Sequence, residues 1–356
     1  MRLRLRARLA WAAGAFGVAG AVLAAKRRQK PPPFLTVLNY HRINVPDATV
    51  EVDEGVLDAT PESLDRQLGI LRRHFSFIAL DDLLHHLDGN PLPPNPALVT
   101  FDDGYRDNLT NALPVLRRHG VRAAFFVATE YVAKRRLFWW DRITWIVKHA
   151  RKRRFSLSGP GAEDVDLQQG IEPAARRLHE VVKRHAGLDL EGFLESLARA
   201  ADAPWSEAIE KELVDRHVMG WDDVRALRAA GMDVGSHTRT HRVLSTIPAT
   251  ELASELSGSR AELEDVLGEP VPALAYPVGK PVASIPDVRA AVVDAGYRLA
   301  FSYGAGRQDL TRLDPLDVCR FAVDKDTTEN ALLAQIALPW LMRRRKPDPR
   351  AHGSDR

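Results

Sequence analysis

The chain has 356 residues, of which 45% are hydrophobic, so it is long enough for one large globular domain or two smaller ones. Its single cysteine, Cys319, excludes an internal disulfide and a cysteine-rich structural metal site. The net charge of +3 is unevenly distributed, because residues 1–30 carry eight basic and no acidic residues. The rest of the chain is therefore mildly acidic, which argues against a nucleic-acid-binding surface.

An uncharged run of 17 residues occupies positions 9–25. As a helix it would span about 26 Å, slightly less than the ~30 Å core of a bilayer, and flanking Arg and Lys side chains can cover the difference. A cleavable signal peptide is the alternative, since Ala19-Gly20-Ala21 fits a small-x-small cleavage site. That cleavage would leave a strongly basic mature start. We therefore favour an uncleaved anchor, followed by the stiff spacer Pro31-Pro32-Pro33, so that residues 1–33 form the anchoring segment.

Apolar runs with strand character alternate with helical patterns over residues 34–330. The expected strands are 35–40, 75–80, 97–101, 123–128, 232–235, 272–276, 298–302 and 318–323. The expected helices include 61–74, 105–119, 221–230, 250–267 and 286–295. This alternation predicts an α/β fold with a parallel sheet or barrel.

The region from about residue 134 to 219 interrupts that alternation and reads as a helical insertion. It contains the aromatic cluster Phe138 to Trp145, which could stack against sugar rings or pack as a hydrophobic lid on the domain. We favour the lid, because large aromatic side chains dominate ordinary cores. After the domain, residues 331–356 form a basic tail that we expect to be solvated.

Two adjacent carboxylates follow one of the expected strands. Asp102, Asp103 and Gly104 come directly after the run that ends at Phe101, and ligands of α/β proteins bind at the carboxyl ends of strands. One carboxylate could hold a cation while its neighbour faces a water molecule. Asp-Asp-Gly is also favourable turn chemistry and could cap the next helix, so the pair alone does not establish a site.

Two histidines follow a second expected strand end. His237 and His241 are four residues apart, a spacing that places them on one face of a helical turn, where both can reach one metal ion. One carboxylate and two imidazoles leave an open position, as in catalytic metal sites. This ligand set suits zinc, and other first-row divalent ions are possible.

These segments resemble the polysaccharide deacetylase family, the NodB-homology carbohydrate esterases. The resemblance rests on Thr100 to Gly104, on Ser236 to His241, on Ala275-Tyr276-Pro277-Val278-Gly279 and on Asn39-Tyr40-His41-Arg42. It implies a distorted (β/α) barrel from about residue 34 to 323. It also implies Asp102 as the general base, Asp103, His237 and His241 as metal ligands, and Tyr276 and Pro277 as residues lining the substrate groove.

The sequence departs from the family pattern at three places. Val278 stands where an aromatic residue usually follows the motif proline. No arginine lies near Ala275 to orient the base, and no Leu-x-His motif supplies a general acid near the end of the domain. His41 and Arg320 are candidates for groups near the groove. The general acid stays unassigned.

The resulting expectation is a metal-dependent hydrolase that removes N-acetyl groups from a polysaccharide. A de-O-acetylase, another N-acyl hydrolase of the same fold and a membrane-tethered glycan-binding pseudoenzyme are the alternatives. Since acetylated glycans lie mostly outside the cytoplasmic membrane, we expect a single-pass protein with residues 34–356 facing outward, with secretion after signal cleavage as the alternative.

Overall fold

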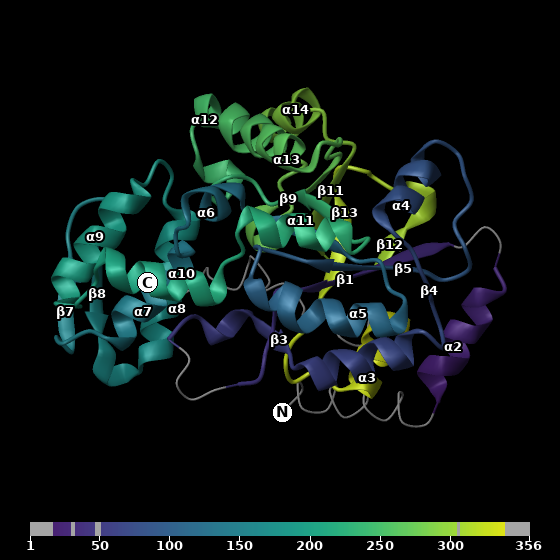
Figure 1. Cartoon of the computed structure of the whole chain (residues 1–356), viewed down its shortest axis with the longest axis horizontal. Helices are drawn as coiled ribbons and strands as arrows, with labels where there is room; N and C mark the ends of the chain where they lie inside the picture. Colours follow the sequence, from purple (N-terminus) through teal and green to yellow (C-terminus); the bar gives the residue numbers. More distant parts are fainter. Residues whose placement is uncertain (1–16, 30–32, 47–50, 305–306, 339–356) are drawn as a thin grey trace, which may run out of the picture.

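The computed structural model describes residues 17–29, 33–46, 51–304 and 307–338. Seven parallel strands form a closed barrel at its centre (Figure 1). In chain order they are β1 (Phe34–Tyr40), β5 (Pro96–Phe101), β6 (Ala124–Val127), β9 (Asp233–Ser236), β10 (Ala273–Ala275), β11 (Leu299–Tyr303) and β13 (Val318–Ala322). Each pairs in parallel with the next, and β1 closes the ring by pairing with both β5 and β13. The predicted (β/α) barrel is confirmed.

Shorter strands lie beside this ring. They are β4 (Ser76–Phe77), parallel to β5, β12 (Arg307–Asp309), antiparallel to β1, and the pair β2 (Arg42–Ile43) and β3 (Leu57–Ala59). The barrel strands alternate between an inner and an outer face, as the period of two requires. On β1, Leu35 and Val37 belong to one hydrophobic cluster and Leu38 and Tyr40 to another. Asn39 continues the Leu35–Val37 face at the carboxyl end of the strand, which places a polar group at that end of the barrel.

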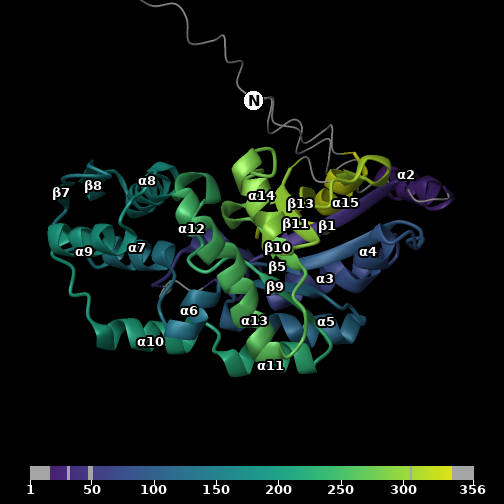
Figure 2. The same ribbon diagram turned by 90° about the horizontal axis from the view of Figure 1, so that it is seen from above.

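Helices cover the outside of the barrel (Figures 1 and 2). They are α3 (Pro61–Leu71), α4 (Leu80–Leu87), α5 (Leu113–His119), α11 (Trp221–Ala229), α12 (Ala249–Ala253), α13 (Ser259–Leu267), α14 (Pro286–Asp294) and α15 (Glu329–Ala337). Two of the expected helices contain a π-helical turn, at Asn108–Ala112 before α5 and at Ser254–Gly258 between α12 and α13. Local capping fixes the start of α3. The Thr60 side chain accepts a hydrogen bond from the Ser63 N–H, and Pro61 is the first helical residue.

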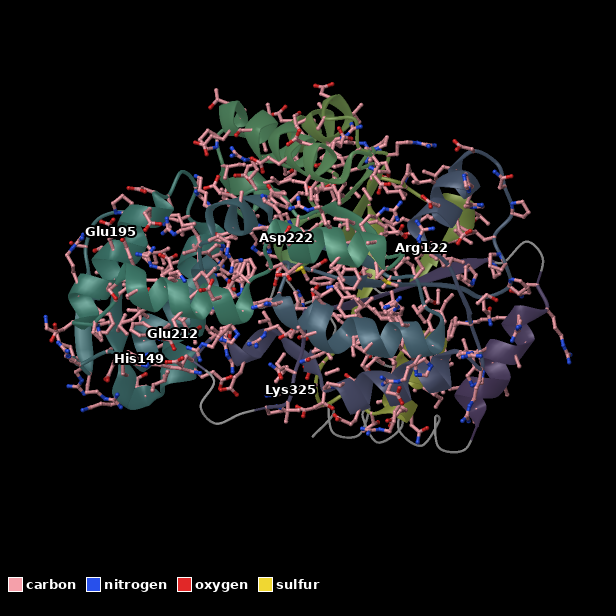
Figure 3. The ribbon with its side chains drawn as sticks, in the orientation of Figure 1. Arg122, His149, Glu195, Glu212, Asp222 and Lys325 are labelled. Carbon is pink, nitrogen blue, oxygen red and sulfur yellow. The ribbon has the colours of Figure 1, made fainter. Side chains whose placement is uncertain are left out.

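The segment between β6 and α11 builds a second, largely helical unit beside the barrel (teal in Figure 1). Its elements are α6 (Thr129–Lys134), α7 (Trp139–Lys148), β7 (Arg154–Leu157), β8 (Glu163–Asp166), α8 (Ile171–Arg184), α9 (Leu190–Ala201) and α10 (Glu207–His217). It has a hydrophobic cluster of its own, which includes Phe138, Trp139 and Trp140. Glu195 and Glu212 carry charge on its outer surface (Figure 3).

Helix α2 (Val18–Arg27) packs against the barrel beside α15, as Figure 2 shows. Its Ala19 and Leu23 are buried, and the Asn95 side-chain amide donates to the Leu23 carbonyl at 2.9 Å. Among the described residues, no helix is both long enough and apolar enough to cross a bilayer. Residues 9–16 of the expected anchor lie outside the described residues, so the anchor stays a prediction.

The C-terminal boundary differs from the expectation. The domain end expected at residue 330 falls inside α15, whose Leu332, Leu333 and Ile336 are buried in the barrel's hydrophobic cluster. Apolar packing therefore holds residues 331–337 against the barrel, while 339–356 lie outside the described residues.

Candidate metal centre and active site

The two aspartates stand where β5 ends at the carboxyl edge of the barrel. The Asp102 N–H donates to the Tyr40 carbonyl and so extends the pairing of β5 with β1 by one residue. Asp103 then adopts a left-handed conformation with φ 76°, and Gly104 follows with φ 99°. Asp is among the residues that tolerate this region best. The sharp change of direction lets neighbouring carboxylates face the same end of the barrel.

His237 and His241 lie on a loop after β9, which corrects the expectation of a helical turn. Thr238 and His241 have positive φ angles of 62° and 53°, so the chain cannot be helical there. Glu255 holds this loop by accepting hydrogen bonds from the backbone N–H groups of Arg239 and Thr240 and from the Thr240 hydroxyl. A buried carboxylate therefore replaces the helical hydrogen bonds that the spacing of four suggested.

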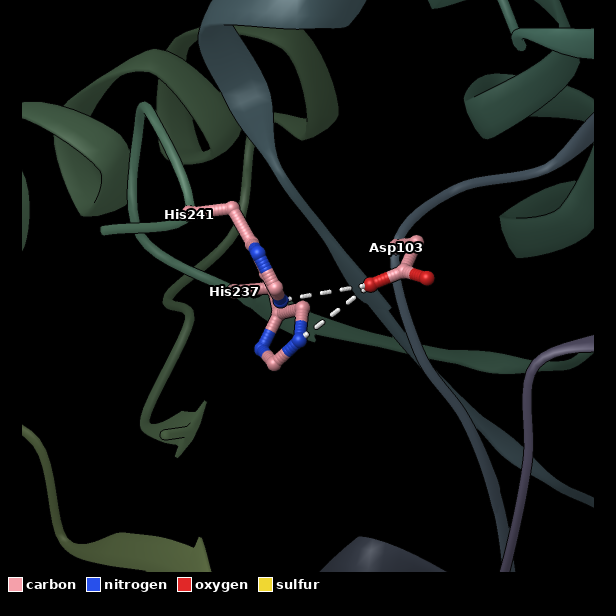
Figure 4. Close-up of side chains that lie close together, drawn as sticks. All are labelled: Asp103, His237 and His241. Atoms are coloured by element: carbon pink, nitrogen blue, oxygen red, sulfur yellow. Dashed lines mark ion pairs between the residues drawn. The ribbon is translucent and has the colours of Figure 1, made fainter. Parts of the chain in front are cut away.

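Asp103, His237 and His241 converge on one point (Figure 4). Asp103 Oδ1 lies 3.4 Å from His237 Nε2 and 3.5 Å from His241 Nε2. Two ligands at 2.0–2.1 Å from a tetrahedral ion lie roughly 3.3 Å apart. Asp103 Oδ1 is also buried and accepts no hydrogen bond within the described chain. An orphaned carboxylate oxygen facing two imidazole nitrogens fits a divalent cation.

Neighbouring groups set the tautomer of His237 and the pKa of His241. His237 Nδ1 donates to the Ala275 carbonyl at 2.8 Å, which leaves Nε2 with its lone pair toward Asp103. Burial, and then the nearby His237, lowers the pKa of His241 well below its usual value. A neutral imidazole is the form that binds a metal.

Arg320 holds the second carboxylate, Asp102, from inside the barrel. Its guanidinium donates to both carboxylate oxygens of Asp102, at 2.7 and 2.8 Å, and to Asn39 Oδ1 at 2.7 Å. The Arg320 side chain is fully buried. Burial alone would raise the pKa of Asp102, but the Arg320 charge and hydrogen bonds hold it below its usual range. The arginine that the sequence lacks near Ala275 has a counterpart on β13.

His41 is placed at the same end of the barrel, just after β1. Its Nδ1 lies 2.8 Å from Asp58 Oδ2, which also accepts the His41 N–H, and its Nε2 lies 3.2 Å from the Tyr303 hydroxyl. Burial opposes protonation, but the Asp58 carboxylate outweighs it and raises the pKa of His41 to about 9. This shift favours the protonated form of the His41 imidazole. Sequence reasoning missed Asp58, because no motif surrounds it.

A pocket of about 160 Å³ connects these groups. Its walls include His41, Asp102, Asp103, both ligand histidines and Tyr303. The expected groove residues Tyr276 and Pro277 are not part of this wall in the described chain. Tyr276 is buried and its hydroxyl donates to the Leu316 carbonyl, while the following Val278 and Gly279 line the pocket instead.

The aromatic cluster of the insertion both fills a core and borders the pocket. Trp139 and Trp140 are 1% and 4% exposed, as expected of a packed lid. The Trp140 ring lies 4.5 Å from the His241 ring between centroids, and both tryptophans line the pocket. The lid thus shields one face of His241, a candidate metal ligand, from water.

A carboxylate–imidazole cluster with a separately held carboxylate, at the carboxyl end of a parallel barrel, is an arrangement that suits hydrolysis. Consistent with this, the polysaccharide deacetylase family model matches residues 89–157 and 197–300. The chain belongs to the polysaccharide deacetylase family and is therefore a hydrolase. His41 and Arg320 lie outside the matched residues.

Solved structures share the fold at low sequence identity. The Streptococcus pyogenes deacetylase PplD in complex with acetate has a TM-score of 0.56 at 16% identity, over 84% of this chain and 96% of that one. IcaB from Ammonifex degensii has a TM-score of 0.52 at 20% identity, over 85% and 97%. A de-N-acetylase from Aggregatibacter actinomycetemcomitans has a TM-score of 0.52 at 14% identity, over 84% and 98%. Among curated proteins, none matches the chain in sequence.

Proposed function

We propose that this protein is a metal-dependent deacetylase that removes N-acetyl groups from a polysaccharide. The observation that carries the proposal is the convergence of Asp103, His237 and His241 beside an ionised Asp102. A divalent cation, with zinc favoured by the ligand set, would supply a Lewis acid for the acetyl carbonyl and lower the pKa of a bound water.

The residues of this chain divide the proton transfers between them. Asp102 accepts the proton of the attacking water, because Arg320 keeps its carboxylate ionised and fixes its direction. His41 holds the proton that the departing sugar amine needs. Its Nδ1 is occupied by Asp58, so Nε2, beside the Tyr303 hydroxyl, is the nitrogen that releases it into the pocket. Arg320 therefore keeps the general base Asp102 ionised, and the Asp58 carboxylate keeps the general acid His41 protonated.

The test is release of acetate and of free amine by the purified full-length protein on N-acetylated polysaccharides, with each divalent ion added in turn. We expect both products in equal amounts, and Asp102→Asn should abolish turnover while metal still binds. Retained activity in that variant would overturn the role of Asp102. Acetate without amine would identify a de-O-acetylase, and stoichiometric metal without turnover on any acetylated glycan would favour a glycan-binding pseudoenzyme.

We also propose that the N-terminal segment holds the protein at the cytoplasmic membrane with the barrel on its outer side, although residues 18–25 of the expected anchor pack on the barrel as part of α2. The support is the uncharged run, the basic residues around it and the extracellular position of such glycans. A reporter fused after Arg356 tests this. Activity of a reporter that works only in the cytoplasm would overturn the proposed orientation.

A further inference from the structure

One cation in the wall of the catalytic pocket has no part in the proposed proton transfers. Lys183 lies on α8 of the insertion, one helical turn after His179, and both residues line the pocket with the metal ligands. His179 is fixed, since its Nε2 donates to the Trp140 carbonyl at 3.0 Å. Through α8 the insertion thus adds a positive charge to the site that the barrel alone does not supply.

The Lys183 ammonium is only weakly engaged by the protein. Within the described chain it donates no hydrogen bond, and its one ion pair is to Glu180 Oε1 at 3.6 Å. The other oxygen of Glu180 is held by Arg184 at 2.9 Å, so this carboxylate already has a closer partner. An ammonium group carries three donors. The side chain is 30% exposed and Lys183 lines the pocket, so the protein does not enclose this side chain completely.

In the described chain, none of the acidic groups that line the pocket forms an ion pair with Lys183. Asp102 is held by Arg320, and Asp103 faces the two imidazoles. Asp53 accepts the Gly55 N–H at 2.9 Å through Oδ1, and its Oδ2 lies 3.8 Å from His179 Nδ1. A ligand that supplies an oxyanion near Lys183 would therefore meet an available donor.

We propose that Lys183 binds an anionic substituent of the glycan, so that the enzyme prefers N-acetylated sugars that carry a carboxylate or phosphate over neutral ones. This inference rests on the proposed function and names the substrate class for the same pocket. The charge is supplied by the insertion and not by the barrel residues that hold the proposed base and ligands.

Binding tests the inference independently of turnover. The full-length protein, in its Asp102→Asn form so that no product accumulates, is titrated calorimetrically with three probes. These are an N-acetylglucosamine trisaccharide, an N-acetylglucosamine–glucuronate tetrasaccharide and N-acetylglucosamine 6-phosphate. We expect at least one charged probe to bind about tenfold more tightly than the neutral one, with the preference reduced at high salt. The two charged probes distinguish a carboxylate from a phosphate. Equal affinity for all three would overturn the inference.

Variants at two neighbouring positions separate charge recognition from structural damage. Lys183→Met should reduce the affinity ratio of charged to neutral probe to about one, Lys183→Arg should retain it, and Lys183→Glu should invert it. Arg184→Met is the matched control, since Arg184 is the next residue, is 78% exposed and does not line the catalytic pocket. A ratio that falls as far in Arg184→Met as in Lys183→Met would overturn the inference. Failure of the proposed function would appear separately, as absence of acetate release by the wild type on every substrate.

Discussion

Replacing Arg320 should reveal a large interaction free energy between its guanidinium group and the Asp102 carboxylate. Arg320→Met keeps an apolar side chain of similar length inside the barrel but removes both hydrogen bonds to Asp102 and the one to Asn39. Breaking a buried ion pair by deleting one partner costs about 3–5 kcal/mol, mostly because the other charge is left buried without compensation. We expect a loss of this size in the free energy of unfolding, together with loss of deacetylation.

A double-mutant cycle with Asp102→Asn tests the physical cause. Once the carboxylate is neutral, removing Arg320 no longer strands a buried charge, so the two losses should be non-additive by about 2–3 kcal/mol. Denaturant unfolding followed by circular dichroism gives the four free energies. Arg42→Met is the matched control, because Arg42 is also buried and paired, but with Asp107 at 3.0 Å, and its loss should add to that of Asp102→Asn. If Arg320→Met unfolds the protein, Arg320→Gln, which also removes the charge, replaces it. Additivity within about 0.5 kcal/mol for the Arg320 cycle would refute this reasoning.

Three further predictions concern the acid, the ligands and pH. His41→Gln should reduce kcat by about 10²–10⁴ on an N-acetyl sugar, and much less on an acetyl ester with a good leaving group, since only the amine needs a proton; equal losses on both would contradict the acid role. Elemental analysis should find stoichiometric zinc in the wild type; His241→Gln should lose it, whereas the exposed His85→Gln should keep it. Burial raises the pKa of Asp141 from 3.8 to about 7. The folded state therefore holds this proton more tightly, and stability should fall as pH rises from about 4 to about 7, by at most ~1.4 kcal/mol per pH unit for one proton. Asp141→Asn should remove that slope in unfolding titrations at pH 4.5, 5.5 and 6.5, and an unchanged slope would contradict the assignment.

Local pattern was sufficient for the alternation of strands and helices because these elements carry their own periodicity, whereas the family resemblance was needed to choose a barrel over an open sheet. The expected strand at 97–101 is β5 (Pro96–Phe101), and the expected helix at 61–74 begins at the predicted Pro61. Turn chemistry also located Asp102 and Asp103, since Asp-Asp-Gly after an apolar run marks a strand end. The backbone conformation after β9 could not be predicted from local sequence. The i, i+4 spacing suggested a helical turn, but Glu255, distant in sequence, satisfies the amides of Arg239 and Thr240 and makes a loop stable.

The sequence by itself determined which chemical groups this protein brings to its site: one carboxylate and two imidazoles as ligands and a second carboxylate as base. Only the tertiary structure decided which partners control them. Arg320 reaches Asp102 across 218 positions of sequence, because closure of the barrel puts β13 next to β1 and its inward face beside the end of β5. Asp58 reaches His41 from a short strand without a motif, and Lys183 reaches the pocket only because the insertion folds over it. Local residue patterns are sufficient to predict the types of ligand. Ion pairs between residues distant in sequence cannot be predicted in this way, because they depend on which strand ends lie side by side in the closed barrel.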